Sequence, residues 1–488
     1  MCVCAEFAHS YAVHLRVKCR YGKRAHRREK KGILPLKIDT VGREISRILV
    51  ANRGEIAVRI IYAAREMGIE TVAIYSEADE NSLHVQLADY SVRIGGAKPE
   101  ESYLNVPNII AAAEAWGADA IHPGYGFLAE NPTFARIVES HDLVFIGPRA
   151  EHIELMGDKV EAKRVARRAG VPLVPGTDEP IESVEEAKRI AAEIGYPVLL
   201  KAAAGGGGRG MRVVESEREM ENRFLSASSE AEAAFGDGRL YLEKFITRPK
   251  HIEVQVFGDE YGNFTHLYER ECSLQRRHQK VMEEAPSPSI GPEKRKEVVE
   301  YALRLVKEIG YLNAGTVEFL YDGEGNFYFI EMNTRVQVEH PVTEMVTGVD
   351  IIKAQILVAM GERLPFDGDR ITLNGHAIEA RINAEDPENN FAPSPGKIDL
   401  LHKPGGFGVR VDSHVYQGYV IPPYYDSMIA KLVAWGKDRD EAISRLKRAL
   451  DEFVLEGIKS NVPLHLRVLE RREFLEGKFY TDSLERWV

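Results

Sequence analysis

Residues 315–341 read GTVEFLYDGEGNFYFIEMNTRVQVEHP and predict a β-hairpin that runs on into a polar segment. Two apolar runs, 315–321 and 327–333, flank the sequence DGEG at 322–325, which is typical of a hairpin turn. The apolar positions set the register, which pairs Tyr321 with Tyr328, Phe319 with Ile330 and Val317 with Met332.

The same register places two carboxylates side by side. Glu318 lies opposite Glu331, and directly opposite residues project from one face of a sheet. Asn333, two residues further on, shares that face. Neighbouring carboxylates repel unless a cation lies between them, and these oxygen ligands suit Mg²⁺ that bridges phosphates. The hairpin therefore predicts a metal site; the alternative is a solvated face on which like charges are tolerated.

Polar residues continue at every second position from Glu331 to Glu339, so they line one face if the strand stays extended. Arg335 and Glu339 are then suited to hold an anion and take its proton. An exposed strand with alternating charge is an equally open interpretation. Further basic groups, Lys250 and His251, are expected just before another strand.

Upstream of the hairpin, strands alternate with helices, which predicts an α/β fold with a parallel sheet. A helix is expected over 56–67. The expected strands are 47–52, 71–75, 118–122 and 143–147. The first turn lacks Gly-x-Gly-x-x-Gly, so this Rossmann-like unit is expected to shape one wall of a site without binding a dinucleotide. The loop 122–127 follows a strand and is expected to line the ligand crevice.

Residues 205–210, with the sequence GGGGRG, lie between two predicted strands, 197–201 and 211–214. A dinucleotide site would need a helix after the glycines, and a Walker A loop would need Gly-Lys-Ser/Thr. A strand–glycine–strand loop instead suits a flap whose backbone N–H groups approach phosphates. A flexible hairpin tip is the alternative.

The chain has 488 residues, which is enough for about two to four domains. Its net charge of −11 argues against nucleic acid as the main partner. The sequence holds no apolar run of membrane-spanning length, and its four cysteines fit a reducing, cytoplasmic compartment. We therefore expect a cytoplasmic protein with no membrane association.

Residues 1–44 differ from the rest of the chain, because they carry eleven Lys/Arg against four Asp/Glu. They show no clear period and no helix start signal. A targeting peptide would be basic, but it would be richer in serine or contain an apolar core. We expect a disordered basic extension or the product of an upstream start codon, with no catalytic role.

The motifs taken together resemble biotin carboxylase, an ATP-grasp ligase, over residues 47 to about 482. The most specific stretch is FIEMNTRVQVEHP at 329–341. The other matching blocks are ANRGEIA (51–57), HPGYGF (122–127), MGDK (156–159), GGGGRGM (205–211), ECSLQRRHQK (271–280), RINAEDP (381–387) and PPYYDSM (422–428).

The resemblance implies a mixed α/β (α+β) architecture built around an ATP-grasp fold. Residues 45–158 would form an N-terminal Rossmann-like (pre-ATP-grasp) domain, and 159–375 the ATP-grasp domain, with a glycine-rich lid near 175–245. Residues 376–482 would form the biotin carboxylase C-terminal domain.

The family uses MgATP and bicarbonate to carboxylate biotin through carboxyphosphate. This is the first half-reaction of acetyl-CoA, propionyl-CoA or pyruvate carboxylases. The sequence contains no Ala-Met-Lys-Met biotinylation site, so biotin is expected on a separate carrier protein, with a separate carboxyltransferase.

The resemblance also implies residue roles. ATP would contact Lys159, Lys201, Gly207, Gly208, Glu243, Lys244, Phe245, Ile246, His251, Gln275 and His278. Two Mg²⁺ or Mn²⁺ ions would bind Glu318, Glu331 and Asn333. Bicarbonate would contact Lys280, Arg335, Gln337 and Val338, with Glu339 as the general base. Biotin would meet Tyr125 and Arg381, which would stabilise its developing oxyanion.

Glu66, Phe407 and Arg410 match the family's dimer contacts, so a homodimer is expected, although Tyr62 replaces an arginine of well-known dimeric members. Two rival functions stay open at this point: a ligase of the carbamoyl-phosphate synthase type, and a non-catalytic carboxylase subunit.

Overall fold

The structure is a computed structural model that describes residues 42–203 and 211–487. Among these, a five-stranded parallel sheet with the order β3-β2-β1-β4-β5 forms the first part of the chain. Its strands are β1 (Arg47–Val50), β2 (Glu70–Ser76), β3 (Tyr90–Gly95), β4 (Ala120–His122) and β5 (Val144–Phe145). Its helices are α1 (Gly54–Glu66), α2 (Leu83–Leu87), α3 (Val106–Ala115), α4 (Pro132–Ser140) and α5 (Ala150–Gly157). The predicted parallel sheet is confirmed, with β1, β4 and β5 shorter than expected.

The chain builds this sheet outward from β1, first through β2 and β3 on one side and then through β4 and β5 on the other. The strand order therefore reverses at β1. Ligands bind outside the carboxyl ends of the strands at such a point. There the Asn52 side chain donates from Nδ2 to the carbonyl oxygens of Pro123 and Tyr125, each at 2.7 Å. These bonds fix the loop after β4 at the crevice.

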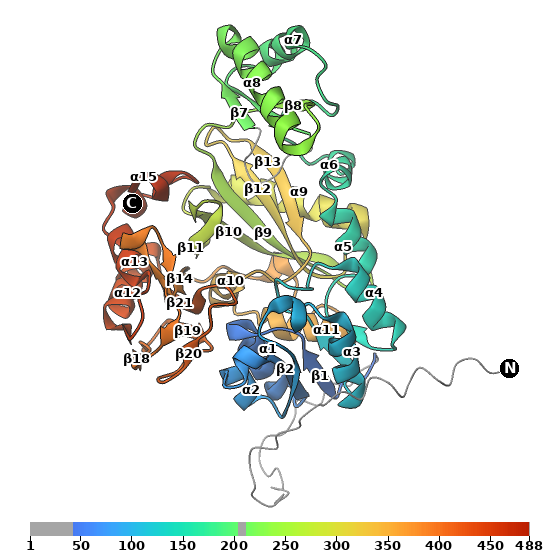
Figure 1. The fold of residues 1–488 in the computed structure, drawn as a ribbon, viewed down its shortest axis with the longest axis vertical. Coiled ribbons are helices and arrows are strands. Elements are labelled where there is room, and N and C mark those ends of the chain that lie inside the picture. Colours follow the sequence, from blue (N-terminus) through green and yellow to red (C-terminus); the bar gives the residue numbers. More distant parts are fainter. Residues whose placement is uncertain (1–41, 204–210, 488) are drawn as a thin grey trace, which may run out of the picture.

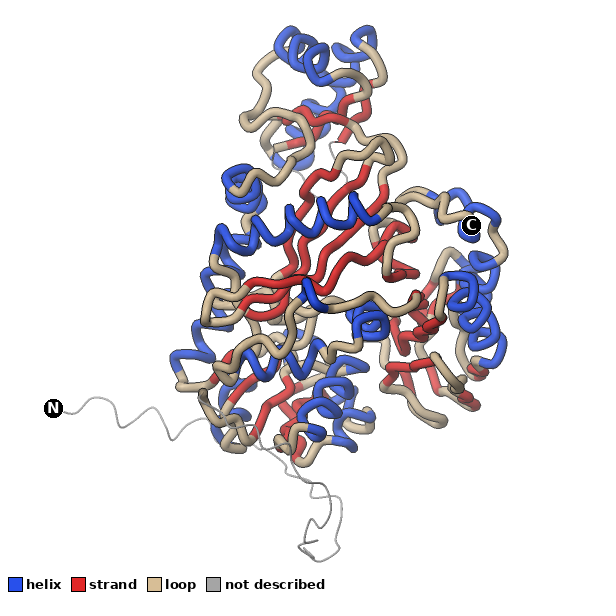
Figure 2. Tube along the Cα trace, turned by 180° about the vertical axis from the view of Figure 1, so that it is seen from behind, coloured by secondary structure: helices blue, strands red, loops and turns tan. Residues whose placement is uncertain are grey.

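A long antiparallel sheet with the order β13-β12-β9-β10-β11-β14-β21-β19 runs through the middle of the molecule (Figure 1). Its strands are β9 (Lys250–Gly258), β10 (Phe264–Arg276), β11 (Gln279–Ala285), β12 (Asn313–Tyr321), β13 (Phe327–Asn333), β14 (His376–Asn383), β19 (Val409–Ser413) and β21 (Met428–Gly436). Helix α9 (Pro292–Ile309) lies across one face, as Figure 2 shows. It buries Val298, Ala302 and Leu305 against Val254 and Val317, which makes this face the core of the central part.

The predicted hairpin forms, but its register changes along its length. Glu318 pairs with Glu331 and Val317 with Met332, as predicted. Beyond them, Phe319 pairs with Phe329 and Tyr321 with Phe327. The expected pairs of Tyr321 with Tyr328 and Phe319 with Ile330 are therefore wrong. A β-bulge leaves Ile330 as one extra residue on β13, which a count of alternating positions does not reveal.

The polar segment after the hairpin is not an extended strand. β13 ends at Asn333, and a turn leads to α10 (His340–Thr347), which is followed by α11 (Ile351–Ala359). The expectation that period two continues to Glu339 is therefore wrong. The expectation that Lys250 and His251 precede a strand is also wrong, because both lie within β9.

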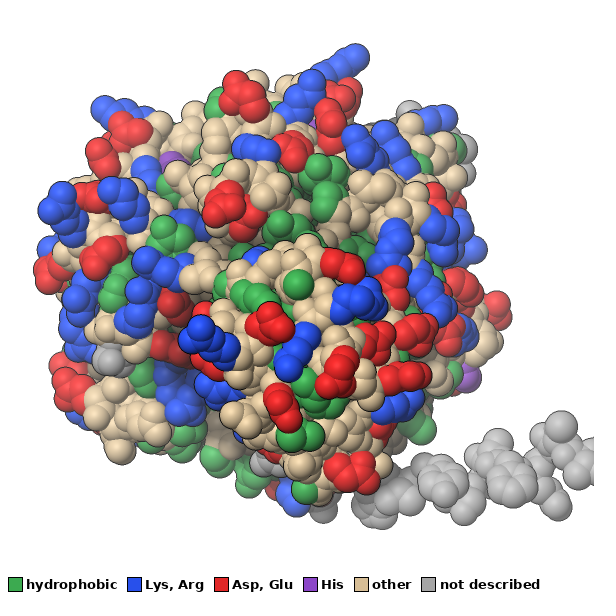
Figure 3. All heavy atoms as spheres, turned by 90° about the horizontal axis from the view of Figure 1, so that it is seen from above, with side chains coloured by type: hydrophobic (Ala, Val, Ile, Leu, Met, Phe, Trp, Pro, Cys, Tyr) green, Lys and Arg blue, Asp and Glu red, His purple; other side chains and the backbone are tan. Residues whose placement is uncertain are grey.

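A small unit, called the lid below because it falls in the predicted lid region, stands at one end of the central sheet (Figure 1). It consists of the sheet β7-β6-β8 and helices α7 (Val184–Ile194) and α8 (Glu217–Phe235), and α6 (Lys159–Arg168) precedes it. The strands are β6 (Val198–Ala202), β7 (Met211–Val214) and β8 (Leu240–Lys244), and they have their own apolar core. The face seen in Figure 3, over the lid, mixes acidic and basic side chains. The predicted phosphate flap at 205–210 lies outside the described residues.

The last part of the chain packs helices on β14 and β21. Its helices are α12 (Arg439–Glu452), α13 (Val462–Leu469), α14 (Arg472–Leu475) and α15 (Ser483–Trp487). Short strands complete it: β15 (Glu385–Asp386), β16 (Ala392–Pro393), β17 (Gly396–Lys397), β18 (Leu400–His402), β20 (Val420–Ile421) and β22 (Val454–Glu456). Leu446 and Leu450 of α12 pack with Ile378 and Leu432 in one core. The central sheet is thus shared between two parts of the chain.

Tyr425 ties the last part of the chain to a buried ion pair of the first part. Arg53 donates from Nε and Nη2 to the two carboxylate oxygens of Asp79, at 2.6 and 2.9 Å. Its guanidinium carbon lies 4.1 Å from the centre of the Tyr425 ring. The Tyr425 hydroxyl donates to the Ala97 carbonyl at 2.5 Å. These contacts hold the two parts around the crevice.

Glu284 of β11 should make an acid-sensitive contribution to stability. Its carboxylate lies 2.6 Å from His376 Nε2 and accepts from Arg439 Nε at 2.7 Å. Burial opposes its ionisation, but Arg439 and His376 outweigh burial and lower its pKa to about 2. Because this pKa lies below the ordinary value of 4.5, the contribution is complete above pH 4.5 and is lost as the pH falls toward the folded-state value.

We expect Glu284→Gln to lower the free energy of unfolding by about 3 kcal/mol at neutral pH. The difference from the wild type should shrink as the pH falls below the ordinary carboxyl range. Urea denaturation at several pH values measures both effects. Glu293→Gln, at an exposed position in α9, is the control. A difference that stays constant with pH would contradict this account.

Candidate active site

A cavity of about 1410 Å³ lies where the first part, the lid, the central sheet and the last part meet. Most residues predicted to bind substrates line it. These are Tyr125, Lys159, Lys201, Glu243, Lys244, Phe245, Ile246, His251, Gln275, His278, Lys280, Glu318, Glu331, Asn333, Arg335, Gln337, Val338 and Arg381. Gly207 and Gly208 lie outside the described residues. Glu339 is fully buried behind the cavity wall.

The hairpin supplies the first polar cluster of the cavity. Glu318 accepts from Asn333 Nδ2 at 2.8 Å and from Gln337 Nε2 at 3.1 Å. Burial opposes the ionisation of Glu318, but Lys280 and His251 outweigh burial and hold its pKa well below its ordinary value. Burial and the charge of Glu318 raise the pKa of Glu331. A cation between Glu318 and Glu331 would relieve this repulsion, so the donor set fits a hard metal ion.

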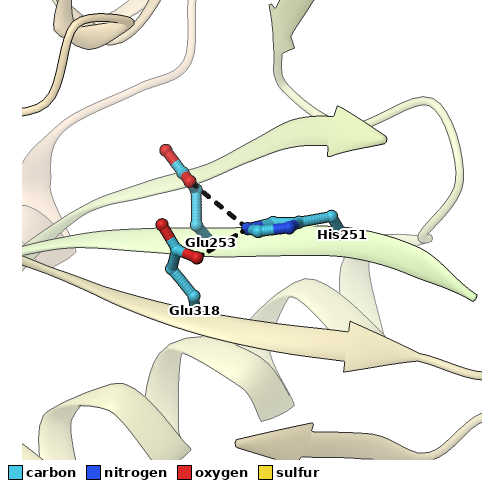
Figure 4. A group of neighbouring side chains, drawn as sticks. All are labelled: His251, Glu253 and Glu318. Atoms are coloured by element: carbon cyan, nitrogen blue, oxygen red, sulfur yellow. Dashed lines mark ion pairs between the residues drawn. The ribbon is translucent and has the colours of Figure 1, made fainter. Parts of the chain in front are cut away.

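Glu253 of β9 is a buried member of this cluster that the sequence reasoning missed. Glu253 pairs across the sheet with Glu318, and its side chain is fully buried. Figure 4 shows both carboxylates pointing toward the His251 ring, whose Nε2 lies 3.0 Å from Glu318 and 3.7 Å from Glu253. These three side chains lie close enough to share a metal ion. The signal was present in the sequence, because His251 and Glu253 are two residues apart on one strand.

Lys280 joins this cluster to Glu339. Its Nζ donates to Glu253 at 2.5 Å, to Glu318 at 3.0 Å and to Glu339 at 2.6 Å. Three carboxylates therefore surround one ammonium, and their attraction outweighs burial and raises the pKa of Lys280 well above its ordinary value. Lys280 thus stays positively charged at neutral pH.

Glu339 lies between two cations. One of its oxygens accepts from Lys280, and the other accepts from Arg381 Nη2 at 2.9 Å. Burial opposes ionisation, but Lys280 and Arg381 outweigh burial and keep the pKa of Glu339 well below its ordinary value. The second partner of Arg381 is Glu283, at 2.5 Å from Nε, another residue that the sequence reasoning missed. The carboxylates of Glu283 and Glu339 thereby fix the orientation of the Arg381 guanidinium.

Arg335 is held at the mouth of the cavity. It donates to Asn333 at 3.0 Å and to Gln337 at 2.8 Å. The side chains of the predicted polar run therefore do come together, but a turn brings them together and not an extended strand. Arg335 Nε also donates at 2.8 Å to Glu130, which lies beyond β4 in the first part of the chain. Motif spacing did not reveal Glu130, because it is 205 residues away from Arg335 in sequence.

The nucleotide-binding residues predicted from the sequence lie between the lid and the central sheet. The carboxylate of Glu243, on β8, forms an ion pair with Lys201 of β6 and accepts a hydrogen bond from Lys163 at 2.8 Å. Lys159 begins α6, whose first N–H groups are capped by Asp158. Gln275 Nε2 lies 3.0 Å from His251 Nδ1. The lysines face one cavity, where they are suited to meet phosphates.

Comparison with known proteins identifies the family of the chain. Residues 44–153 match the biotin carboxylase N-terminal domain, and 379–486 match the biotin carboxylase C-terminal domain. Residues 158–366 match the ATP-binding domain of the carbamoyl-phosphate synthase L chain. The central match alone would leave the rival ligase open, but the two flanking matches favour biotin carboxylase.

The chain is 56% identical to biotin carboxylase 1 of Bacillus subtilis over 444 residues, 91% of this chain and 99% of that protein. It is 54% identical to a pyruvate carboxylase subunit of Methanothermobacter thermautotrophicus over 442 residues, 91% of this chain and 90% of that protein. It also matches the biotin carboxylase domain dimer of 2-oxoglutarate carboxylase from Hydrogenobacter thermophilus, solved with MgADP, ADP and bicarbonate. That match has a TM-score of 0.82 and 54% identity, and it covers 91% of this chain and 97% of that chain.

Fold and site together define an ATP-dependent ligase built on an ATP-grasp domain between an N-terminal and a C-terminal domain. The chain belongs to the biotin carboxylase family, and its activity is the ATP-dependent carboxylation of biotin. The family includes subunits of acetyl-CoA, pyruvate and 2-oxoglutarate carboxylases, so the set of acceptors is wider than the three expected from the sequence. None of the described helices is both long and apolar enough to cross a membrane.

Proposed function

We propose that this chain carboxylates biotin on a separate carrier protein, through carboxyphosphate, using the residues gathered around Lys280. The observation that carries the proposal is Glu339, a fully buried carboxylate held between Lys280 and Arg381. In this position a base for bicarbonate and a cation for biotin lie side by side.

In the first step, Arg335, Lys280, Gln337 and the Val338 backbone bind bicarbonate, and Glu339 takes its proton. The deprotonated oxygen then attacks the γ-phosphorus of ATP, and ADP leaves. Lys159 and Lys201 balance the charge of the phosphates, and His251 contacts the nucleotide. Bound Mg²⁺, held by Glu318, Glu331 and Asn333, would supply further neutralisation of phosphate charge.

In the second step, carboxyphosphate gives CO₂ and phosphate, and the phosphate takes the N1′ proton of biotin. Arg381 stabilises the oxyanion that develops on the ureido oxygen, and Tyr125 faces the ring. The N1′ nitrogen then attacks CO₂. Carboxyphosphate is labile in water, so the lid has to close before it forms.

We place the domain bounds at 45–158, 159–375 and 376–482, with a lid near 175–245. The family matches at 44–153, 158–366 and 379–486 support these bounds. A homodimer is supported by the dimeric relative and by Phe407, whose exposed fraction is 78%. A carboxyltransferase on another chain would take the carboxyl group to the final acceptor.

The test is ADP release by the purified chain with MgATP and bicarbonate, with and without free biotin. We expect turnover that rises with biotin and disappears without bicarbonate. Bicarbonate-dependent turnover that ignores biotin and rises with ammonia would contradict the proposal. Mn²⁺ in place of Mg²⁺, and the number of ions bound per chain, are measured in the same preparation.

Removing one proposed metal ligand should change the metal requirement. We expect Glu331→Gln to raise the Mg²⁺ concentration for half-maximal activity by about tenfold, because one of two charged ligands is lost. Titration of ADP release with Mg²⁺ at saturating ATP measures this shift. Glu324→Gln, in the exposed turn of the same hairpin, is the matched control. An unchanged Mg²⁺ titration would remove Glu331 from the metal site.

A further inference from the structure

We propose that Lys431 is a positioning residue that holds two walls of the carboxylation site in place. Lys431 lies on β21, and its side chain is fully buried. It pairs across the sheet with Arg381 on β14 and with Asp412 on β19. Paired residues project from one face, so its ammonium lies on the same side of the sheet as Arg381. The role rests on the function proposed above.

The first wall is the turn before α10. Lys431 Nζ donates to the carbonyl oxygen of Val338 at 2.8 Å. A peptide group is rigid, so this bond fixes the plane from which Glu339 projects. On the other side of the turn, His340 Nδ1 lies 2.8 Å from the Gln337 carbonyl oxygen. The turn that presents Gln337 and Glu339 is thus braced from within by His340 and anchored to β21 by Lys431.

The second wall is the loop that carries Tyr125. Lys431 Nζ lies 3.1 Å from a carboxylate oxygen of Glu55, near the start of α1. The other oxygen of Glu55 accepts from the Tyr125 hydroxyl. A chain of contacts therefore runs from Tyr125 through Glu55 and Lys431 to Val338. It joins the N-terminal part, the C-terminal part and the bicarbonate turn.

The charges explain why a lysine stands in this buried position. Burial raises the pKa of Glu55, and Lys431 is the largest influence that opposes the rise. Without the ammonium, the protonated form of Glu55 would be favoured, and it would accept less strongly from Tyr125. The Val338 carbonyl would also lose its donor, which is costly for a backbone group partly shielded from water. Both walls should loosen together.

Lys431→Met removes the ammonium and keeps most of the buried stem. Because a displacement of about 1 Å at a reacting centre costs up to about 100-fold, we expect the KM values for bicarbonate and biotin each to rise about tenfold. The KM for ATP should stay within about twofold, because the proposed nucleotide contacts are made by other elements. Steady-state ADP release with each substrate varied in turn gives the three values. Lys437→Met, in the exposed turn after β21, is the matched control.

Glu55→Gln separates the two walls. It keeps the shape of the side chain and removes the charge that links Lys431 to Tyr125. We expect its KM for biotin to rise about fivefold and its KM for bicarbonate to stay within about twofold, since only the Tyr125 side loses its anchor.

Three results would overturn the role of Lys431. One is a folded Lys431→Met enzyme, shown by intact ADP binding, whose KM values for bicarbonate and biotin match the wild type. The second, which decides the matter if Lys431→Met does not fold, is a Glu55→Gln enzyme with an unchanged KM for biotin. The third is a wild-type chain without biotin-dependent turnover, which would overturn the proposed function itself and this role with it.

Discussion

Glu339→Gln should lower kcat for biotin-dependent ADP release by about 10³, within the range that a general base contributes. Glutamine keeps the size of the side chain and an acceptor for Lys280 or Arg381, but it cannot take a proton from bicarbonate. The substitution also removes the anion that balances two buried cations. The loss should appear in kcat at saturating bicarbonate, because proton transfer fails even when the substrate is bound.

Glu339 is bonded to two cations when no substrate is bound. Lys280 and Arg381 keep the pKa of Glu339 low, which makes the carboxylate a weak base in the resting site. Bicarbonate and biotin have to draw these cations toward themselves before Glu339 becomes an effective base. We therefore expect Glu339 to be ionised at neutral pH and below, so its own titration should not limit kcat/KM near neutrality.

Binding of ADP, measured by calorimetry, separates a chemical defect in Glu339→Gln from a failure to fold. The ADP affinity should match that of the wild type. Glu324→Gln, exposed in the hairpin turn, is the matched control and should keep full activity. A loss of less than about tenfold would show that another group is the base, since general bases contribute at least about 10².

Arg381→Met is the second large prediction, and it should affect the biotin half of the reaction. Removing one donor to a developing oxyanion costs about 10²–10³ in kcat. Biotin-dependent ADP release should fall by this amount, while slow bicarbonate-dependent ADP release without biotin should persist. A variant in which both rates fall equally would place Arg381 in the phosphorylation step.

Arg381→Lys tests whether charge or geometry matters. Arg381 contacts Glu283 from Nε and Glu339 from Nη2, and one ammonium does not reproduce this fork. We expect Arg381→Lys to recover only part of the lost rate. Arg370→Met, whose side chain is 88% exposed, is the control and should behave as the wild type. Full recovery by lysine would show that a point charge is sufficient.

Local patterns predicted the elements of this site well. The turn at 322–325 and the alternation beside it located the hairpin and the pairing of Glu318 with Glu331. The sequence reasoning missed the bulge at Ile330, because an apolar run has the same composition with or without one extra residue in the strand. The strand predicted through 339 ended at Asn333, because a period-two pattern does not show where the chain turns.

Local sequence patterns were sufficient to predict the α/β alternation, the hairpin with its carboxylates, and a set of motifs specific enough to indicate the family. These features depend on neighbouring residues, so they can be read along the chain. The contacts between distant side chains became visible in the folded chain: Glu130 with Arg335, Glu283 with Arg381, and Lys431 with Glu55. The reason is physical, because a buried charge is stable only beside a partner. The tertiary arrangement determines that partner, because it brings together strands and loops that are far apart in sequence.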